Sequence, residues 1–332
     1  MSGVRGVSGS GGGVAQRGPR EERMAEVDVD RIKAQVAAAR AAQSQEPLLS
    51  RLGRWEIRSN EQAAALLRSH LEKTGLDLQA LERAAGSETL PSPPEPSPDA
   101  APAHARRLAQ AAKVRRGQVQ AVRAARERDN RALPLLPPAE IIQPAYIGAT
   151  PAGMFVQDNL APDDNWVQVE LKGTGDLGGG SAGFFYLWTN PTQEAIGLSV
   201  EGLMGFVGVC SGTAKRGFAG GHAHFFVTAG LNVYEAGGGV LDFVARTDVV
   251  EVTVDSFGLW LESQSKSVNV DALVDLSYDQ LVVPGGGRIV VEAVAGFGYN
   301  NINGEEVFDF AGNFSRVSSP NMTFTPKPII IT

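Results

Sequence analysis

Cysteine is almost absent from this sequence, since Cys210 is the single cysteine among 332 residues. A lone thiol excludes an intrachain disulfide and fits a reducing compartment. The sequence also lacks any apolar run of the roughly 18 residues that a membrane-spanning helix needs. Its first residues contain no apolar stretch of signal-peptide length. We therefore expect a soluble, cytoplasmic protein without a membrane span, with export by a non-classical route as the alternative.

Sequence signatures of the common enzyme classes are missing as well. The chain contains no Gly-x-Ser-x-Gly nucleophile elbow and no His-Glu-x-x-His zinc motif. Its glycine-rich stretches at 173–183 and 285–287 do not end in Lys-Ser or Lys-Thr and lead into no helix, which a phosphate-binding loop requires. The whole chain has four histidines, so few general bases are available. The sequence therefore predicts no catalytic residues, no cofactor and no metal ion.

Charge divides the chain into two unlike parts. Residues 1–138 carry 22 basic and 16 acidic residues, whereas residues 139–332 carry 8 basic and 21 acidic residues. The net charges are thus +6 for the first part, here called the arm, and −13 for the second, here called the head. Opposite net charges predict attraction between arm and head, either within one chain or between copies.

Composition divides the arm further. Residues 1–22 are rich in glycine and serine and predict a disordered tail. Residues 23–88 contain apolar residues at helical spacing and predict a small helical segment. Residues 89–103 are rich in proline and predict an extended linker. Residues 104–133 predict a basic helix, which the following prolines end.

The basic helix is the candidate site for contact with a polyanion. Its positive side chains suit phosphate or other anionic groups. The helix lacks interleaved aromatic residues and the whole chain is acidic, so a solvated helix that leads into the head is the favoured interpretation and nucleic acid is disfavoured. The candidate contact residues are Arg106, Arg107, Lys113, Arg115, Arg116 and Arg123.

From residue 139 onward, apolar and polar residues alternate in short runs. Alternation places every second side chain on the same face of a strand, and it occurs in WVQVEL (166–171), VEVTVD (250–255) and RIVVEAVAGFGY (288–299). Glycine, asparagine and proline separate the runs, and Asn303-Gly304 is the strongest predicted hairpin turn. Residues 139–332 are therefore expected to form an all-β domain, an antiparallel β-sandwich or jelly-roll-like fold.

Few residues of the head stand out as ligand-binding candidates. His222 and His224 lie two apart, so a strand would place both imidazoles on one face, where they suit a ligand or part of a metal site. An ordinary exposed strand face is the alternative, and no third metal ligand is near in sequence. Trp188 belongs to a set of aromatic residues that suits either a binding platform or the core. Cys210 follows an apolar run and is expected to be a buried, inert thiol.

Three hypotheses about the function remain. The favoured one is a non-catalytic binding or assembly protein, in which the head recognises a protein or saccharide partner and the arm tethers the head or forms homo-oligomers. The first alternative is a hydrolase or lyase on a β-sandwich scaffold, which requires carboxylates or histidines that converge in a cleft. The second alternative is contact of the basic helix with a polyanion or nucleic acid.

Overall fold

A computed structural model describes residues 100–129 and 136–329, except 163, 174, 176, 216–219, 236–239, 257–262 and 313–314, together with residue 34. Apart from residue 34, the predicted tail (1–22) and small helical segment (23–88) lie outside the described residues. The linker (89–103) does so as well, except for its last four positions.

Most of the described part of the arm is one long helix, α4 (Ala100–Asp129). It occupies the place of the predicted basic helix but begins at Ala100, inside the segment predicted to be a linker. Pro102 is compatible with this start, because the first turn of a helix has no intrahelical partners for its N–H groups. In the part of the chain that the structure describes, no helix is long and apolar enough to cross a membrane.

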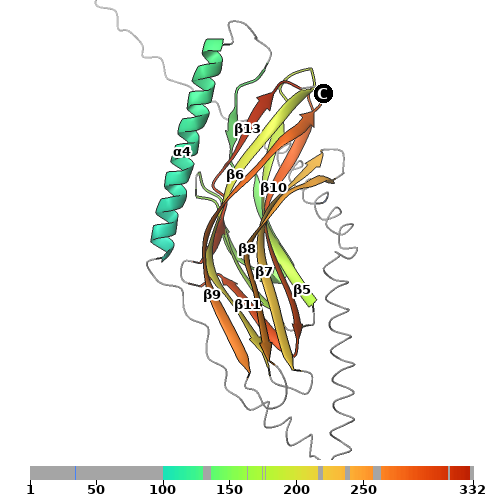
Figure 1. Cartoon of the computed structure of the whole chain (residues 1–332). Helices are drawn as coiled ribbons and strands as arrows, with labels where there is room; N and C mark the ends of the chain where they lie inside the picture. Colours follow the sequence, from blue (N-terminus) through green and yellow to red (C-terminus); the bar gives the residue numbers. More distant parts are fainter. Residues whose placement is uncertain are drawn as a thin grey trace, which may run out of the picture.

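The head consists of two antiparallel sheets that pack face to face (Figure 1). The eight-stranded sheet has the order β1-β13-β6-β11-β4-β12, with β9 paired to β6 and β3 paired to β4. The five-stranded sheet has the order β2-β5-β10-β7-β8. The predicted all-β sandwich is therefore confirmed.

The strands of the eight-stranded sheet are β1 (Glu140–Ile142), β3 (Phe155–Asn159), β4 (Trp166–Gly173), β6 (Ile196–Ala214), β9 (Gln264–Val283), β11 (Gly304–Phe310), β12 (Arg316–Ser318) and β13 (Met322–Lys327). Those of the five-stranded sheet are β2 (Tyr146–Thr150), β5 (Leu177–Thr189), β7 (Gly221–Glu235), β8 (Val240–Ser256) and β10 (Arg288–Ile302), and a short 3-10 helix, η1 (Ala152–Met154), precedes β3.

The core lies between the sheets, where the alternating runs place their apolar residues. Val167 and Val169 of β4 and Val252 and Val254 of β8 are buried, as the alternation predicts. On β10 the buried face consists of Ile289, Val291, Ala293, Ala295 and Phe297. Removal of each large apolar side chain from water contributes about 2 kcal/mol. The apolar side chains that both sheets contribute to the shared core therefore explain why the two layers stay together.

The predicted hairpin at Asn303-Gly304 is wrong. β10 belongs to the five-stranded sheet and β11 to the eight-stranded one, so the chain crosses between the sheets here. Of the two residues, only Asn303 has a positive φ, 50°, whereas a type I′ turn needs positive φ at both. Asn303 instead bonds to the end of β6: its carbonyl accepts from the Lys215 N–H (2.9 Å) and its Nδ2 donates to the Lys215 carbonyl (3.1 Å). Tertiary contacts thus override the local turn preference.

Candidate functional site

Helix α4 lies along the outer face of the eight-stranded sheet, next to β6 and β9 (Figure 1). Its apolar contacts come from three buried side chains, Leu108, Ala112 and Val119. The sheet contributes Leu203 of β6 and Leu273 of β9. The apolar part of this contact is small, because alanine rather than leucine occupies much of the helix face.

Basic residues on α4 form ion pairs with acidic residues on β9. Arg107 Nη2 donates to both carboxylate oxygens of Asp271, and Arg115 Nη2 donates to Asp275 Oδ1 at 2.9 Å. Eight helical residues span about 12 Å and four strand residues about 13 Å, so the two spacings coincide. The attraction between arm and head that the charge distribution predicts is thus present within one chain. Each exposed pair contributes about 0–1 kcal/mol on its own.

His104 anchors the first part of α4. The residue is 1% exposed, and its Nδ1 lies 2.8 Å from Asp271 Oδ1. Its Nε2 is buried and has no hydrogen-bond partner among the described residues. Burial is the main cause that lowers the pKa of His104, against the opposing effect of the Asp271 carboxylate. The sequence gives one signal for this role: His104, Leu108 and Ala112 follow each other at four-residue spacing, as residues of one helix face do.

The far part of α4 is fixed by Arg123, whose Nε donates to the Ala139 carbonyl at 2.6 Å. Three of the six polyanion candidates, Arg107, Arg115 and Arg123, therefore bind the head. The other three are exposed on α4: Arg106, which donates to the Pro102 carbonyl at 3.2 Å, Lys113 and Arg116. The structure thus divides the candidates into three that bond to the head and three that are exposed on α4.

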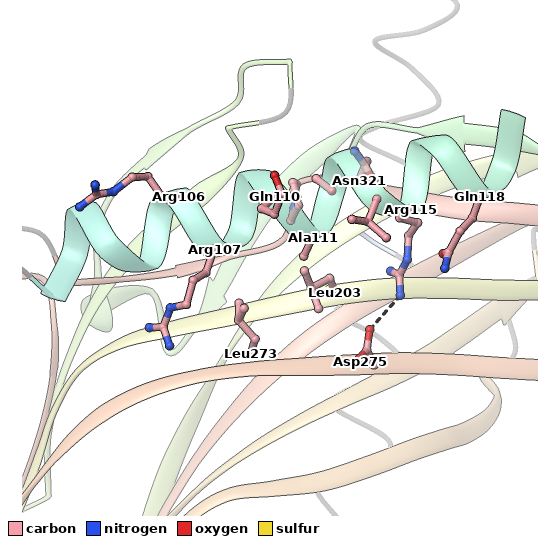
Figure 2. Close-up of a pocket in the computed structure, with 13 residues that line it drawn as sticks. Arg106, Arg107, Gln110, Ala111, Arg115, Gln118, Leu203, Leu273, Asp275 and Asn321 are labelled. Carbon is pink, nitrogen blue, oxygen red and sulfur yellow. Dashed lines mark hydrogen bonds and ion pairs between the residues drawn. The ribbon is translucent and has the colours of Figure 1, made fainter.

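A groove of about 630 Å³ separates parts of α4 from the sheet. Figure 2 shows the arginines and amides that border it, with Arg115 directed toward Asp275. The floor is apolar, and the small side chain of Ala111 leaves the space open. The lining residues include Arg106, Arg107, Gln110, Val114, Arg115, Gln118, Leu203, Leu273, Asp275 and Asn321. Because Arg107 and Arg115 are already paired with carboxylates, the groove is primarily a feature of the contact between α4 and the head.

The two predicted ligand-binding histidines lie on β7, on the outer face of the five-stranded sheet. His222 Nδ1 is 2.7 Å from Asp255 Oδ1, and His224 Nε2 is 3.1 Å from Glu251 Oε1. The two imidazole rings are 6.4 Å apart. Each imidazole thus has its own carboxylate on β8, and the four side chains form what we call the imidazole–carboxylate row. Among the described residues, no group of three histidine, cysteine, aspartate or glutamate side chains is arranged to hold a metal ion.

An aromatic ring continues this row. Phe226 follows His224 on the same face, with the two rings 5.9 Å apart. The phenyl ring lies directly over Gly298 of β10, where a β carbon would come within 2.1 Å of it. The Arg246 guanidinium lies 6.0 Å from the ring centre. This face therefore offers hydrogen-bond donors, acceptors and an apolar surface side by side.

Trp188 is not part of this surface. It lies in the core, 2% exposed, and stacks against Phe324 of the opposite sheet at 6.2 Å. In the strand register Trp188 pairs with Ile289 of β10, whereas His222 pairs with Ile302. Thirteen residues along a strand correspond to about 43 Å. The structure therefore brings His222 and His224 together but places Trp188 at the other end of the sheet.

One buried carboxyl group was not predicted from the sequence. Glu306 of β11 is fully buried; its Oε2 accepts a hydrogen bond from Asn301 Nδ2 at 2.7 Å. Its Oε1 has no hydrogen-bond partner in the described part of the chain. Burial raises the pKa of Glu306 to about 7. The only signal was the oxygen-rich run around Asn303-Gly304, which is typical of an exposed turn.

Cys210 lies in the core between the sheets. Burial raises the pKa of its thiol, and the nearby Asp309 carboxylate adds to this effect. A protonated thiol is a poor nucleophile. The position agrees with the predicted buried and unreactive cysteine.

Comparisons with known proteins do not identify a family. No protein-family model matches the chain, and no curated protein matches it. The carbohydrate-binding module TmCBM61 in complex with beta-1,4-galactotriose has 13% sequence identity over 58% of this chain and 89% of its own, with a TM-score of 0.16. The structure of infectious bursal disease virus Gx strain has 11% identity over 58% and 37%, with a TM-score of 0.18. A CocE/NonD family hydrolase from Staphylococcus aureus has 9% identity over 54% and 32%, with a TM-score of 0.14. TM-scores this low support no conclusion about function.

Proposed function

We propose that this chain is a non-catalytic binding or assembly protein, in which the head recognises a protein or saccharide partner and the arm tethers the head. The observation that carries the proposal is the docking of α4 along one face of the head. His104, Arg107, Arg115 and Arg123 hold the helix at successive points over its length. A helix held in this way gives the arm a defined direction relative to the head, which a tether needs.

The end of the outer face of the five-stranded sheet that carries the imidazole–carboxylate row is the proposed partner-binding surface. It lies on the side of the sandwich opposite to α4 (Figure 1). There the imidazole–carboxylate row presents groups that bond hydroxyl and amide groups, and Phe226 adds an apolar contact. His222 and His224 are about a quarter exposed, at 23% and 24%. A surface with such mixed chemistry suits a saccharide or the polar surface of a protein.

A binding experiment with the full-length protein tests this proposal. The protein is applied to a glycan array and, in parallel, used to capture proteins that are then identified. Binding is measured again for the variant in which His222 and His224 are both alanine, and for Phe226→Ala. The control is Lys172→Ala, which changes an exposed residue of the eight-stranded sheet. We expect at least a tenfold loss of affinity for the first two variants and no change for the control.

Two results would contradict the proposal. One is a ligand whose affinity is the same for all variants while each variant keeps the wild-type melting temperature. The other is turnover of a ligand that a single carboxylate or histidine substitution abolishes without loss of stability, because this is the behaviour of an enzyme.

A further inference from the structure

The contact between His104 and the head has the features of a pH-sensitive clamp. We infer that α4 is docked while the His104 imidazole is neutral and separates from the head when the imidazole takes up a proton. This inference rests on the proposed function for the role of the arm, since release of α4 would change the direction of the tether. Its test measures docking alone and needs no partner.

In the docked position, a second N–H on the His104 ring would have no hydrogen-bond acceptor among the described residues. The ring lies against Gly205 of β6, and a β carbon there would lie 2.5 Å from Nε2. Nδ1 already faces Asp271, whereas Nε2 is enclosed and has no acceptor among the described residues. An imidazolium needs acceptors at both nitrogens. Protonation in the docked position would thus bury an N–H donor of a charged ring without an acceptor, which is unfavourable.

The charged groups around His104 oppose one another. Asp271 of β9 favours the imidazolium, whereas Arg107 of α4 and Arg316 of β12 disfavour it. Arg107 already bonds to both oxygens of Asp271, so this carboxylate is largely neutralised as a partner for a second cation. Burial therefore dominates, and the pKa of His104 lies below its ordinary value of 6.5.

The lowered pKa of His104 in the docked state sets the direction of the pH dependence. The docked state has the lower pKa, so docking is strongest above about pH 6.5 and weakens as the pH falls from there toward the docked pKa. Partial burial raises the pKa of Asp271, but the hydrogen bonds from Arg107 and His104 outweigh it and the pKa is lowered overall. Asp271 therefore remains ionised in this range, and His104 is the group of this cluster that titrates.

The remaining contacts of α4 are weak enough for one side chain to matter. Among the described residues, three buried apolar side chains, exposed ion pairs and one hydrogen bond from Arg123 hold the helix, and a groove separates other parts of it from the sheet. Exposed ion pairs contribute little to the stability of such a contact. Protonation of the single buried imidazole of His104 can therefore shift the docking equilibrium.

The test is a distance measurement on the full-length protein. Spin labels are attached at Ala109→Cys on α4 and Ser277→Cys on β9, both exposed positions, while the buried Cys210 stays unlabelled. Pulsed electron paramagnetic resonance then gives the distance distribution between pH 8 and pH 5. We expect one short distance at pH 8 and a second, longer population at pH 5. The ratio of undocked to docked molecules should rise by at most about tenfold per pH unit, as for a single proton.

Two variants test whether His104 causes the pH-dependent change in distance. His104→Gln keeps a group that can bond to Asp271 but does not titrate, so it should show the same distribution at both pH values. His222→Gln, on the opposite sheet, should respond as the wild type does. Wild-type distances that do not change with pH, or a His104→Gln variant that responds like the wild type, would overturn the inference. If His104→Gln is undocked throughout, the wild-type titration decides: a one-proton midpoint below about 6.5 supports the clamp, and any other result refutes it.

Discussion

Gly205 and His104 fit each other in shape: a β carbon on residue 205 would lie 2.5 Å from His104 Nε2 and 3.3 Å from Leu108 Cδ1. The glycine on β6 thus creates the space in which the arm is anchored. The two residues are far apart in sequence and have no local reason to be matched. Their fit indicates that docking of α4 is part of the native structure, and it gives the first prediction.

Gly205→Ala should weaken the docking of α4. The added methyl group displaces the imidazole, and overpacking of this kind costs about 1–3 kcal/mol. Urea denaturation and limited proteolysis within 100–129 measure the effect. Gly117→Ala is the matched control: nothing lies within 4 Å of a β carbon at Gly117 of the same helix. This control should raise stability by about 0.5–1 kcal/mol, because alanine is the better helix former. Equal effects of the two substitutions would contradict the prediction.

Arg115 and Asp275 should be energetically coupled. Arg115→Glu places two carboxylates together and should speed proteolysis of α4, whereas adding Asp275→Arg to that variant should restore much of the protection. A double-mutant cycle with these two changes is expected to give a coupling energy of up to about 1 kcal/mol, because Asp275 is 82% exposed. High salt should reduce the coupling. A coupling energy of zero at low salt would show that the pair does not hold the helix.

Glu306 should make the stability of the head depend on pH. Its pKa is raised from 4.5 to about 7, so the folded head prefers the protonated carboxyl group. The stabilisation is complete below about pH 4.5 and is lost as the pH rises through about 7. The free energy of unfolding should therefore fall by roughly 2 kcal/mol between pH 5 and pH 8 from this group.

The variant Glu306→Gln should remove this dependence, because its side chain is neutral at both pH values. Chemical denaturation at pH 5 and pH 8 provides the measurement. The control is Glu201→Gln, which changes an exposed glutamate of β6. It should keep the wild-type difference between the two pH values. The prediction fails if both variants lose the difference or both retain it.

The head should fold without the arm. Residues 139–332 contain both sheets and the core between them, so this fragment should give a β-type circular dichroism spectrum and a cooperative melting curve. It should be less stable than the full chain, because loss of α4 exposes Leu203 and Leu273, at a cost of about 1–3 kcal/mol. A fragment without a cooperative transition would show that the arm is required for folding.

Much of the fold follows from local sequence patterns. Alternation in β4, β8 and β10 indicates which side chains face the core, because a strand directs successive side chains to opposite faces. The change in composition after Pro138 separates helix from sheet, because alanine-rich and valine-rich segments prefer different backbone conformations. The opposite net charges of arm and head also predicted their attraction. These properties depend on each residue and its near neighbours, and they could be predicted.

Contacts between distant residues could not be predicted in this way. His104 and Asp271 are separated by 167 positions, and Asn303-Gly304 connects two sheets because Lys215 binds it there. Glu306 fits beside Gly173, its register partner on β4, because a β carbon at Gly173 would lie 2.7 Å from Glu306 Oε2. Local patterns were enough to predict the alternating runs, their core-facing residues and the sign of the net charge on each part. Which side chains share an enclosed space depends on how the whole chain folds, because desolvation depends on everything that surrounds a group and not on its own segment.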